Sequence, residues 1–219
     1  MAKTHLKIPF VSELDENFRI DGNCVLYDPS KVEFLGQTHL ELSACRNAHR
    51  LVFRLVNTDG MTLSFTNVHL HHQLEPVDDI IRLDQLRATI EWITELDAMD
   101  QVHYSVLAGD FNFSATSVAY SYATETAGFT SCFAYNNGQE PTKTFPTGLQ
   151  AATMDTDPAL TCDYIFVKPV VAMVATDNAP NRLQPTATYL FGNEPAMHDS
   201  TLYPSDHIGI CALFEAVCK

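Results

Sequence analysis

The stretch from His103 to Asn112, H-Y-S-V-L-A-G-D-F-N, most constrains how this chain can fold. Its apolar run predicts a buried strand with polar residues at the carboxyl end. Asp110 and Asn112 share a face of that strand only if the chain stays extended past Gly109, where glycine would let another backbone or a ligand approach closely. A carboxylate beside an amide suits removal of a proton from water and stabilisation of an oxyanion. A strand followed by an ordinary Asp/Asn turn explains these residues equally well.

Length and composition indicate a globular protein. With 219 residues, the chain can bury a sizeable core, and we expect a single domain over residues 1–219. Hydrophobic residues make up 46% and charged residues 18%, which is typical of folded domains. We expect no membrane span and see no apolar signal-peptide core. The six cysteines form no C-x-x-C pair, so we interpret them as free thiols, mostly in the core, and expect a cytoplasmic or nuclear location.

The net charge of −14 narrows the classes of partner. Binding to duplex phosphates depends on Lys and Arg, so this charge argues against a broad surface for double-stranded DNA. It does not exclude a phosphate-containing substrate, because a divalent metal in a carboxylate site supplies positive charge locally.

Alternating or continuous apolar runs bounded by turn residues predict the strands. The predicted strands are Asn23–Tyr27, Val32–Leu35, Leu51–Val56, Thr62–Leu70, Tyr104–Ala108, Asp163–Val167, Val170–Thr176 and Ile208–Phe214. Turn signals at Asp28-Pro29-Ser30 and Asp59-Gly60 predict that the first four strands form two hairpins.

The best helix pattern covers Asp78–Met99. Leu83, Leu86, Ile90 and Ile93 are spaced by three, four and three residues, which gives one apolar stripe. Acidic residues at its start suit the positive end of a helix. Strand, helix and strand in this order predict α/β layering, with the helix packed on a sheet.

A second helix is predicted over Ser117–Ala127, with Gly128 placed to end it. Phe133–Leu160 is rich in turn residues and predicts a long loop, which inside a compact domain is more often functional than idle. Leu183–Leu202 is predicted to be irregular.

Four polar positions coincide with predicted strand ends, where α/β proteins place ligands. They are Asp110 with Asn112, His69, Asp163, and Asp206 with His207. The carboxylate of Asp163 could hydrogen-bond one nitrogen of His207 and favour its charged form, which leaves the other nitrogen to face a phosphate oxygen or a water.

Each of these residues also has a structural explanation. A lone histidine such as His69 is more often a satisfied surface or core residue than a functional one. Asp163 could cap a turn, and Asp206 with His207 could be polar loop residues. His71 and His72 also follow His69, but His72 falls on the opposite strand face from the other two, so a three-histidine zinc site is not expected.

Three motifs in a fixed order change this balance. V-L-A-G-D-F-N, D-Y-I-F-V and Y-P-S-D-H resemble the motifs of the endonuclease/exonuclease/phosphatase superfamily, which has the deoxyribonuclease I-like fold. T-N-V-H-L resembles the histidine strand of that family, and Arg82 with Gln85 resembles the helix that follows it.

The strand beginning at Asp21-Gly22-Asn23 and the stretch T-L-Y-P-S-D-H resemble most the eukaryotic branch with nocturnin-like and deadenylase-like members. The resemblance covers the chain from about residue 20 to its end. It implies an α/β (α+β) fold, a four-layer sandwich of two mixed β-sheets flanked by helices. It also implies a hydrolase of phosphoester bonds (a phosphodiesterase, nuclease or phosphatase) that depends on Mg²⁺ or Mn²⁺.

The resemblance also implies a role for each polar residue. Asp110 would activate the attacking water, and Asn112 would help to hold that water and the phosphate. His69 would contact the scissile phosphate. His207, oriented by Asp163, would stabilise the transition state, and Asp206 would lie beside the metal.

The start of the chain departs from the family pattern. Family members open with a strand ending in Asn and a later strand ending in Glu, the principal metal ligand. Glu13 is the one candidate here, and its spacing to Asp21 is too short. We therefore expect a domain that lacks these opening strands, leaves strand edges and an apolar face open to water, and binds Mg²⁺ weakly.

Two alternatives follow. The chain could be a catalytically impaired or truncated relative that acts as a binding or regulatory protein, or an α/β binding module whose polar strand ends are coincidental. The second leaves the order of the motifs unexplained. As partner we expect a phosphoester substrate, either an RNA 3′ end or a small phosphorylated molecule.

The charge generates a first prediction. In metal-free buffer at physiological salt, the chain should bind duplex DNA weakly and with little sequence preference, because a net charge of −14 repels the phosphate backbone. Filter retention of labelled duplex measures this. Tight retention under these conditions would contradict the expected preference for RNA ends or small phosphorylated molecules.

Overall fold

A six-stranded mixed sheet forms the centre of the structure, a computed structural model that describes residues 6–9, 23–58, 60–73, 75–147, 158–170, 182–199 and 202–217. The strand order is β3-β4-β5-β6-β8-β7. The strands are β3 (Val32–Leu42), β4 (Arg46–Leu55), β5 (Thr62–His69), β6 (Tyr104–Asp110), β7 (Thr130–Ser131) and β8 (Asp163–Pro169). β5 and β6 run parallel, and the other neighbouring strands pair antiparallel.

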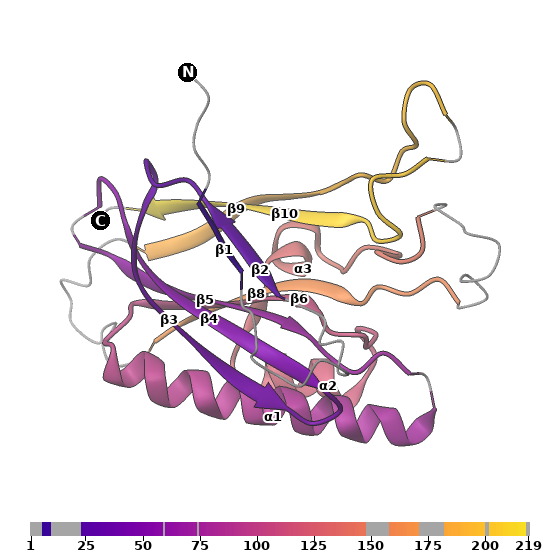
Figure 1. The fold of residues 1–219 in the computed structure, drawn as a ribbon, viewed down its shortest axis with the longest axis horizontal. Helices are drawn as coiled ribbons and strands as arrows, with labels where there is room; N and C mark the ends of the chain where they lie inside the picture. Colours follow the sequence, from indigo (N-terminus) through magenta and orange to yellow (C-terminus); the bar gives the residue numbers. More distant parts are fainter. Residues whose placement is uncertain are drawn as a thin grey trace.

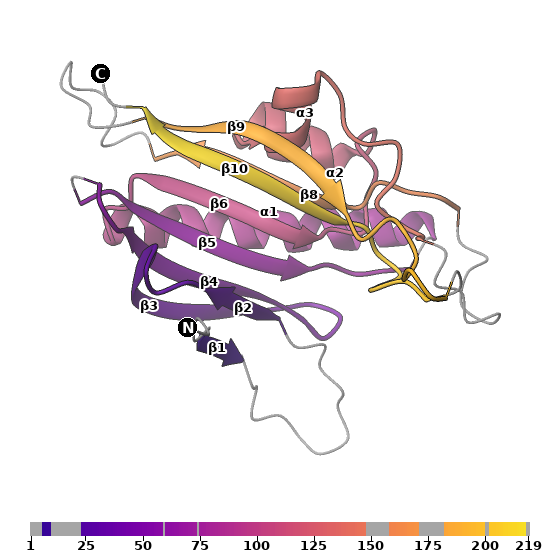
Figure 2. The same cartoon turned by 90° about the horizontal axis from the view of Figure 1, so that it is seen from above.

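A second layer of strands covers one face of this sheet. It contains β1 (Leu6–Pro9) paired with β2 (Cys24–Tyr27), and β9 (Arg182–Phe191) paired with β10 (Gly209–Val217), both antiparallel. Helix α1 lies on the opposite face (Figure 1). Figure 2 shows the two pairs toward opposite edges of the sheet, with β5 and β6 visible between them. The predicted sandwich with flanking helices is confirmed, and its second layer is described as two separate pairs.

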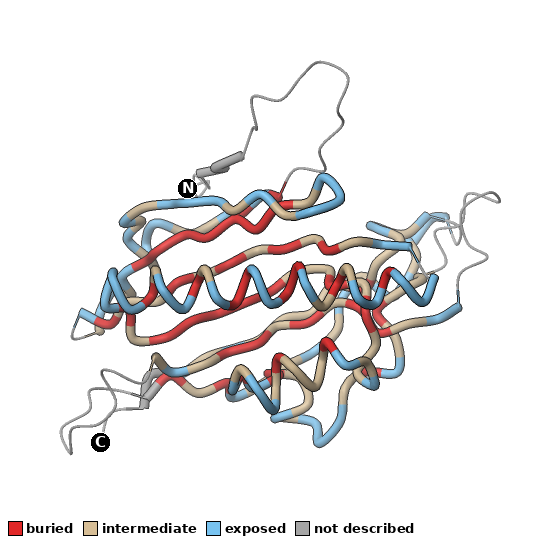
Figure 3. Tube along the Cα trace, turned by 90° about the horizontal axis from the view of Figure 1, so that it is seen from below, coloured by how far each residue is buried: buried red, intermediate tan, exposed pale blue. Residues whose placement is uncertain are grey.

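Helix α1 (Pro76–Met99) connects the parallel strands β5 and β6. Glu75 and Asp78 form a reciprocal capping box, and Pro76 occupies the first turn, so local sequence defines where the helix begins. The predicted apolar stripe is buried against the sheet, and buried positions recur along one side of the helix (Figure 3). The predicted strand–helix–strand unit is therefore confirmed. In the described part of the chain, no helix has the length and apolar character to cross a bilayer.

The second predicted helix is also present. It consists of α2 (Val118–Ser121) and a π-helical continuation, η1 (Tyr122–Thr126). Ser117 caps its start by accepting a hydrogen bond from the backbone N–H of Tyr120 at 3.1 Å, and Gly128 follows its end at φ 76°.

Three secondary-structure predictions are wrong. Helix α3 (Cys132–Asn137) lies where a loop was predicted, because six residues are too few for an apolar period to show. The segment Val32–Leu35 does not return against β2, since β3 pairs with β4 along its length. Arg182–Phe191 is a strand and not irregular. Pro185 lies within this strand at a bulge in the pairing with β10, where proline is tolerated.

The remaining predictions have mixed outcomes. The five described cysteines are free thiols, as expected, but Cys24 and Cys45 are exposed and not in the core. Glu13, Cys218 and, apart from Val170, the predicted strand Val170–Thr176 lie outside the described residues.

A buried ion pair ties α1 to β4. Arg50 Nε and Nη2 donate to Asp97 Oδ1 at 2.9 and 2.7 Å, and its Nη1 lies 2.8 Å from Asp100 Oδ2. The other oxygen of Asp97 accepts from Ser64 Oγ at 3.0 Å. Arg50 is 1% exposed and Asp97 2%. Burying two charges is tolerated only when their hydrogen bonds are satisfied, as they are here.

Asp97→Ala should therefore be strongly destabilising, because it leaves a buried guanidinium without its main partner. We expect the free energy of unfolding to fall by about 3–5 kcal/mol, measured by chemical denaturation. Asp100→Ala is the control: its carboxylate contacts the same arginine but is 46% exposed, so its loss should be about 1 kcal/mol or less. Similar small losses in both variants would show that the buried pair does not anchor the helix.

Candidate active site

The site begins where β5 and β6 end side by side. Their register places Val68 opposite Gly109 and His69 opposite Asp110. Gly109 has φ +139°, and a Cβ there would lie 2.0 Å from the carbonyl oxygen of Val68. Only glycine allows this approach. As a result, His69 Nε2 lies 3.6 Å from Asp110 Oδ2.

Asn112 follows after a turn and not on an extended strand. Its φ is +53°, a left-handed conformation that asparagine tolerates. Its backbone N–H donates to Asp110 Oδ1 at 2.9 Å, and its Nδ2 donates to the carbonyl oxygen of Leu70 at 3.0 Å. Asn112 therefore fixes the Asp110 carboxylate and joins the ends of β5 and β6.

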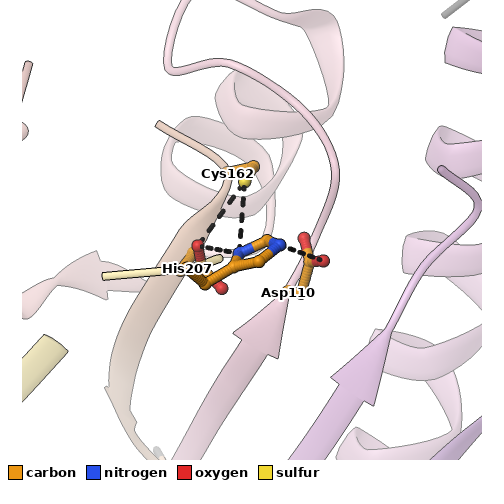
Figure 4. A group of neighbouring side chains, drawn as sticks. Asp110, Cys162 and His207 are labelled. Atoms are coloured by element: carbon orange, nitrogen blue, oxygen red, sulfur yellow. Dashed lines mark hydrogen bonds and ion pairs between the residues drawn. The ribbon is translucent and has the colours of Figure 1, made fainter. Parts of the chain in front are cut away.

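The opposite wall comes from β8 and the loop before β10. Asp163 pairs with Asp110 in the antiparallel register of β6 and β8. His207 Nδ1 lies 2.9 Å from Asp163 Oδ2, which is the hydrogen bond expected from the sequence. His207 Nε2 lies 3.8 Å from Asp110 Oδ2 (Figure 4). One oxygen of Asp110 therefore lies near the Nε2 atoms of both His69 and His207.

A short segment, residues 144–147, holds the loop that carries His207. Backbone hydrogen bonds of 2.8 and 2.6 Å join it to Asp206 and Ile208, on either side of the histidine. The ring of Phe145 packs against the His207 ring, with 4.9 Å between the centroids. The sequence placed these residues in a loop rich in turn signals and gave no sign of this contact.

Cys162 is a site residue that the sequence analysis missed. Its Sγ lies 3.5 Å from Asp163 Oδ2 and 4.0 Å from His207 Nδ1, although the residue is 2% exposed. Thr144 Oγ1 accepts from the backbone N–H groups of Cys162 and Asp163 at 3.0 and 3.1 Å. A cysteine directly before an apolar strand looks like a core residue, so its sequence position carries no signal of a site.

Asp206 is placed differently from the other predicted site residues. One of its carboxylate oxygens accepts from Ser205 Oγ at 3.2 Å. Among the described residues, one group offers donor atoms that all lie within 4.8 Å of one another, and Asp206 is not part of it. That group is Asp110, Cys162, Asp163 and His207.

The histidines after His69 support the fold around the site. His71 Nε2 lies 2.8 Å from Asp78 Oδ1 at the start of α1, and His72 Nδ1 lies 2.8 Å from Arg46 Nη2. Among the described residues, His69, His71 and His72 do not form a group of potential metal ligands.

Arg82 and Gln85, on α1, hold the backbone that leaves β5. Arg82 donates to the carbonyl oxygens of His71, at 3.1 Å, and Gln73. Gln85 accepts from the backbone N–H of His71 at 2.9 Å and donates to the carbonyl oxygen of Ser43 at 2.7 Å. Both side chains are buried, so they fix the position of His69 indirectly.

Burial and the charges at the site together shift the pKa values of His207 and Asp110. Burial lowers the pKa of His207, but its hydrogen bond to Asp163 and the charges of Asp163, Asp110 and Asp206 outweigh burial and raise the pKa to about 9. Burial and the charge of Asp163 raise the pKa of Asp110 to about 6, against the opposing effect of His207. At pH 7, His207 is an imidazolium, and Asp110 is a carboxylate basic enough to accept a proton from water.

The thiol of Cys162 stays protonated in this environment. Burial, followed by the charges of Asp163 and Asp110, raises its pKa far above the ordinary range. In this state the thiol is a weak hydrogen-bond donor and not a nucleophile.

The described carboxylates offer few free oxygen ligands for Mg²⁺. Mg²⁺ takes oxygen ligands in near-octahedral geometry and is often held by one or two carboxylates together with waters and substrate phosphates. Asp163 is engaged with His207, and Asp206 with Ser205. Asp110 also has partners, the backbone N–H of Asn112 at Oδ1 and the two histidines at Oδ2, so an Mg²⁺ here would take most of its ligands from waters and a substrate phosphate.

No protein-family profile matches the sequence, and no curated protein sequence matches it significantly. Solved structures do match. The human nocturnin catalytic domain with bound sulfate has a TM-score of 0.68 at 15% identity, over 97% of this chain and 73% of that domain. TDP2 from D. rerio with a single-strand DNA product has a TM-score of 0.66 at 22% identity, over 96% and 77% of the two chains.

A Bacteroides thetaiotaomicron protein of the endonuclease/exonuclease/phosphatase family also matches, with a TM-score of 0.64 at 17% identity over 96% of this chain and 73% of the other. These similarities establish the fold. The chain has the deoxyribonuclease I-like fold of the endonuclease/exonuclease/phosphatase superfamily, as the order of its motifs predicted.

Asp110→Asn should make the metal-free chain more stable at neutral pH. The pKa of Asp110 rises from 3.8 to about 6 on folding, so the native state binds more protons between these values and loses stability as the pH rises through them. The backbone N–H of Asn112 keeps an acceptor in the variant, because the asparagine side chain at position 110 still carries an Oδ1 atom. We expect a gain of about 2–3 kcal/mol at pH 7 that disappears near pH 4.

Thermal unfolding in a chelator over this pH range measures the effect. Asp84→Asn is the control, because its carboxylate is 65% exposed on α1 and should give no such pH-dependent gain. A lower melting temperature for Asp110→Asn than for the parent at pH 7 would contradict the prediction.

Proposed function

We propose that this chain is a phosphoester hydrolase, either a phosphodiesterase, a nuclease or a phosphatase. The observation that carries the proposal is the position of Asp110 Oδ2, 3.6 Å from Nε2 of His69 and 3.8 Å from Nε2 of His207. A base flanked by two imidazoles suits attack of water on an anionic ester. Neighbours in fold support this: nocturnin binds sulfate, TDP2 holds a DNA product, and one Bacteroides thetaiotaomicron neighbour is a mannosyl-6-phosphatase (TM-score 0.61, 18% identity).

In the proposed reaction, Asp110 Oδ2 accepts a proton from water as the water oxygen attacks phosphorus. The new P–O bond forms as the bond to the leaving oxygen breaks, and that oxygen takes a proton from solvent. His207, protonated at pH 7, donates its Nε2–H to a non-bridging phosphate oxygen, and His69 contacts the same phosphate.

Asn112 and Asp163 position the reacting groups. The N–H of Asn112 occupies Oδ1 of Asp110 and leaves Oδ2 facing the histidines. Asp163 Oδ2 accepts a hydrogen bond from the Nδ1–H of His207, which orients the ring and directs Nε2 towards Asp110. The substrate-binding role proposed for Asn112 uses the second hydrogen of its Nδ2 group.

Mg²⁺ or Mn²⁺ is part of the proposal. When bound, the ion would neutralise charge on the phosphate oxygens. Asp206 would be its ligand from this chain after rotating away from Ser205, which leaves Asp110 Oδ2 free to accept the proton of the attacking water. We therefore expect weak Mg²⁺ binding by the chain alone. For a chain with a net charge of −14, we propose an RNA 3′ end or a small phosphorylated molecule as substrate.

The decisive experiment measures hydrolysis of bis(p-nitrophenyl) phosphate, in Mg²⁺ and in Mn²⁺. Asp110→Asn should lower kcat/KM by about 10²–10⁴, because the general base is lost. His207→Gln should lower it as well, and a chelator should abolish activity until the metal is restored. Asp84→Asn on the exposed side of α1 is the matched control and should leave the rate unchanged.

Two outcomes of this assay would reject the mechanism. Equal rates for Asp110→Asn and the parent would remove Asp110 from it. A parent chain that hydrolyses neither this probe nor RNA or sugar phosphates, but binds phosphate ligands at equilibrium, would favour the second candidate, a binding protein with the same fold. We retain the binding protein as a second candidate because the described site offers few oxygen ligands for a catalytic metal ion.

A further inference from the structure

Four potential metal ligands converge behind the proposed phosphate site. They come from three segments: Asp110 ends β6, Cys162 and Asp163 begin β8, and His207 precedes β10. Three donor atoms are close to one another (Figure 4). Cys162 Sγ is 3.5 Å from Asp163 Oδ2 and 4.0 Å from His207 Nδ1. Asp163 Oδ2 and His207 Nδ1 are 2.9 Å apart.

Two buried cysteines in this chain have different environments. Cys132 belongs to an apolar cluster with residues of β6, β8 and β9. Cys162 is equally inaccessible, but its sulfur lies beside polar atoms of Thr144, Asp163 and His207. A thiol that only filled the core would gain more among apolar side chains, so packing alone does not account for its position.

The spacing of the donors matches a small tetrahedral ion. Zn²⁺ binds sulfur at about 2.3 Å and nitrogen or oxygen at about 2.0–2.2 Å, which places its ligands roughly 3.3–3.6 Å from one another. Of the three short distances in the cluster, that between Cys162 Sγ and Asp163 Oδ2 lies within this range, one of the other two is shorter and one is longer. Small side-chain rotations would therefore close the site around an ion, with Asp110 as the fourth ligand within 4.8 Å.

We propose that Cys162, His207, Asp163 and Asp110 form a zinc site. A thiolate, an imidazole and carboxylates are a ligand set for Zn²⁺ and not for Mg²⁺, which takes oxygen ligands. The ion takes the place of the proton between His207 Nδ1 and Asp163. The thiol proton and the imidazole proton are released to solvent, and the charge of the ion offsets the two aspartates.

Zinc in this position occupies Asp110 and His207. If the proposed function is correct, Zn²⁺ therefore inhibits hydrolysis supported by Mg²⁺, because it removes the base and the phosphate-binding cation together. Zinc binding itself does not depend on that function and is measured separately, so a chain without hydrolase activity still tests the site.

The test uses the full chain in metal-free buffer with Co²⁺ as a spectroscopic probe for zinc. We expect one Co²⁺ per chain, with the thiolate-to-cobalt absorption and the visible bands of a tetrahedral site, both removed by equimolar Zn²⁺. Cys162→Ser should lose the thiolate absorption and bind Zn²⁺ at least tenfold more weakly. Cys132→Ser, the matched control at the other buried cysteine, should behave like the parent.

Folding is checked in the same samples. His207→Gln is a second variant that keeps the buried thiol and should also bind Zn²⁺ at least tenfold more weakly, so the proposal stays testable if Cys162→Ser does not fold. Co²⁺ binding without a thiolate band would overturn it. So would a band that survives in Cys162→Ser, or one that is lost in Cys45→Ser, which alters an exposed thiol.

Discussion

The close approach of β5 and β6 at Gly109 is the constraint on which the site depends. A Cβ at this position would lie 2.0 Å from the carbonyl oxygen of Val68, so any other residue would push the strand ends apart. Separation there would move Asp110 away from His69, its partner in the register. The helix that connects the two strands is held to the sheet by the buried Arg50–Asp97 pair.

The same closeness sets the electrostatics of the site. Burial and the nearby Asp163 raise the pKa of Asp110, which makes it a better base near neutral pH and also costs folding free energy. The hydrogen bond between Asp163 and His207 opposes that cost by keeping a positive charge beside both carboxylates. A chain selected only for stability would have no reason to bury these groups together.

The sequence predicted the parts of this architecture that repeat or that come in a fixed order. The long apolar period of α1 and the motif order around Asp110, Asp163 and His207 were sufficient for the fold class. Short elements were missed because six residues, as in α3, show no period. Cys162 was missed because its role depends on a contact with His207, 45 residues away, and no local pattern encodes such a contact.

The second layer of strands packs on β5, the strand that ends at His69. Leu63 and Phe65 of β5 are partly buried, and they pack against both apolar clusters beneath the two strand pairs. Within the described residues, β10 hydrogen-bonds only to β9, so its other edge offers unpaired backbone groups above this apolar strip. Asn67 and His69 continue the same face of β5 beyond this apolar strip. A strand laid along that edge would therefore bury apolar surface and place its end beside His69.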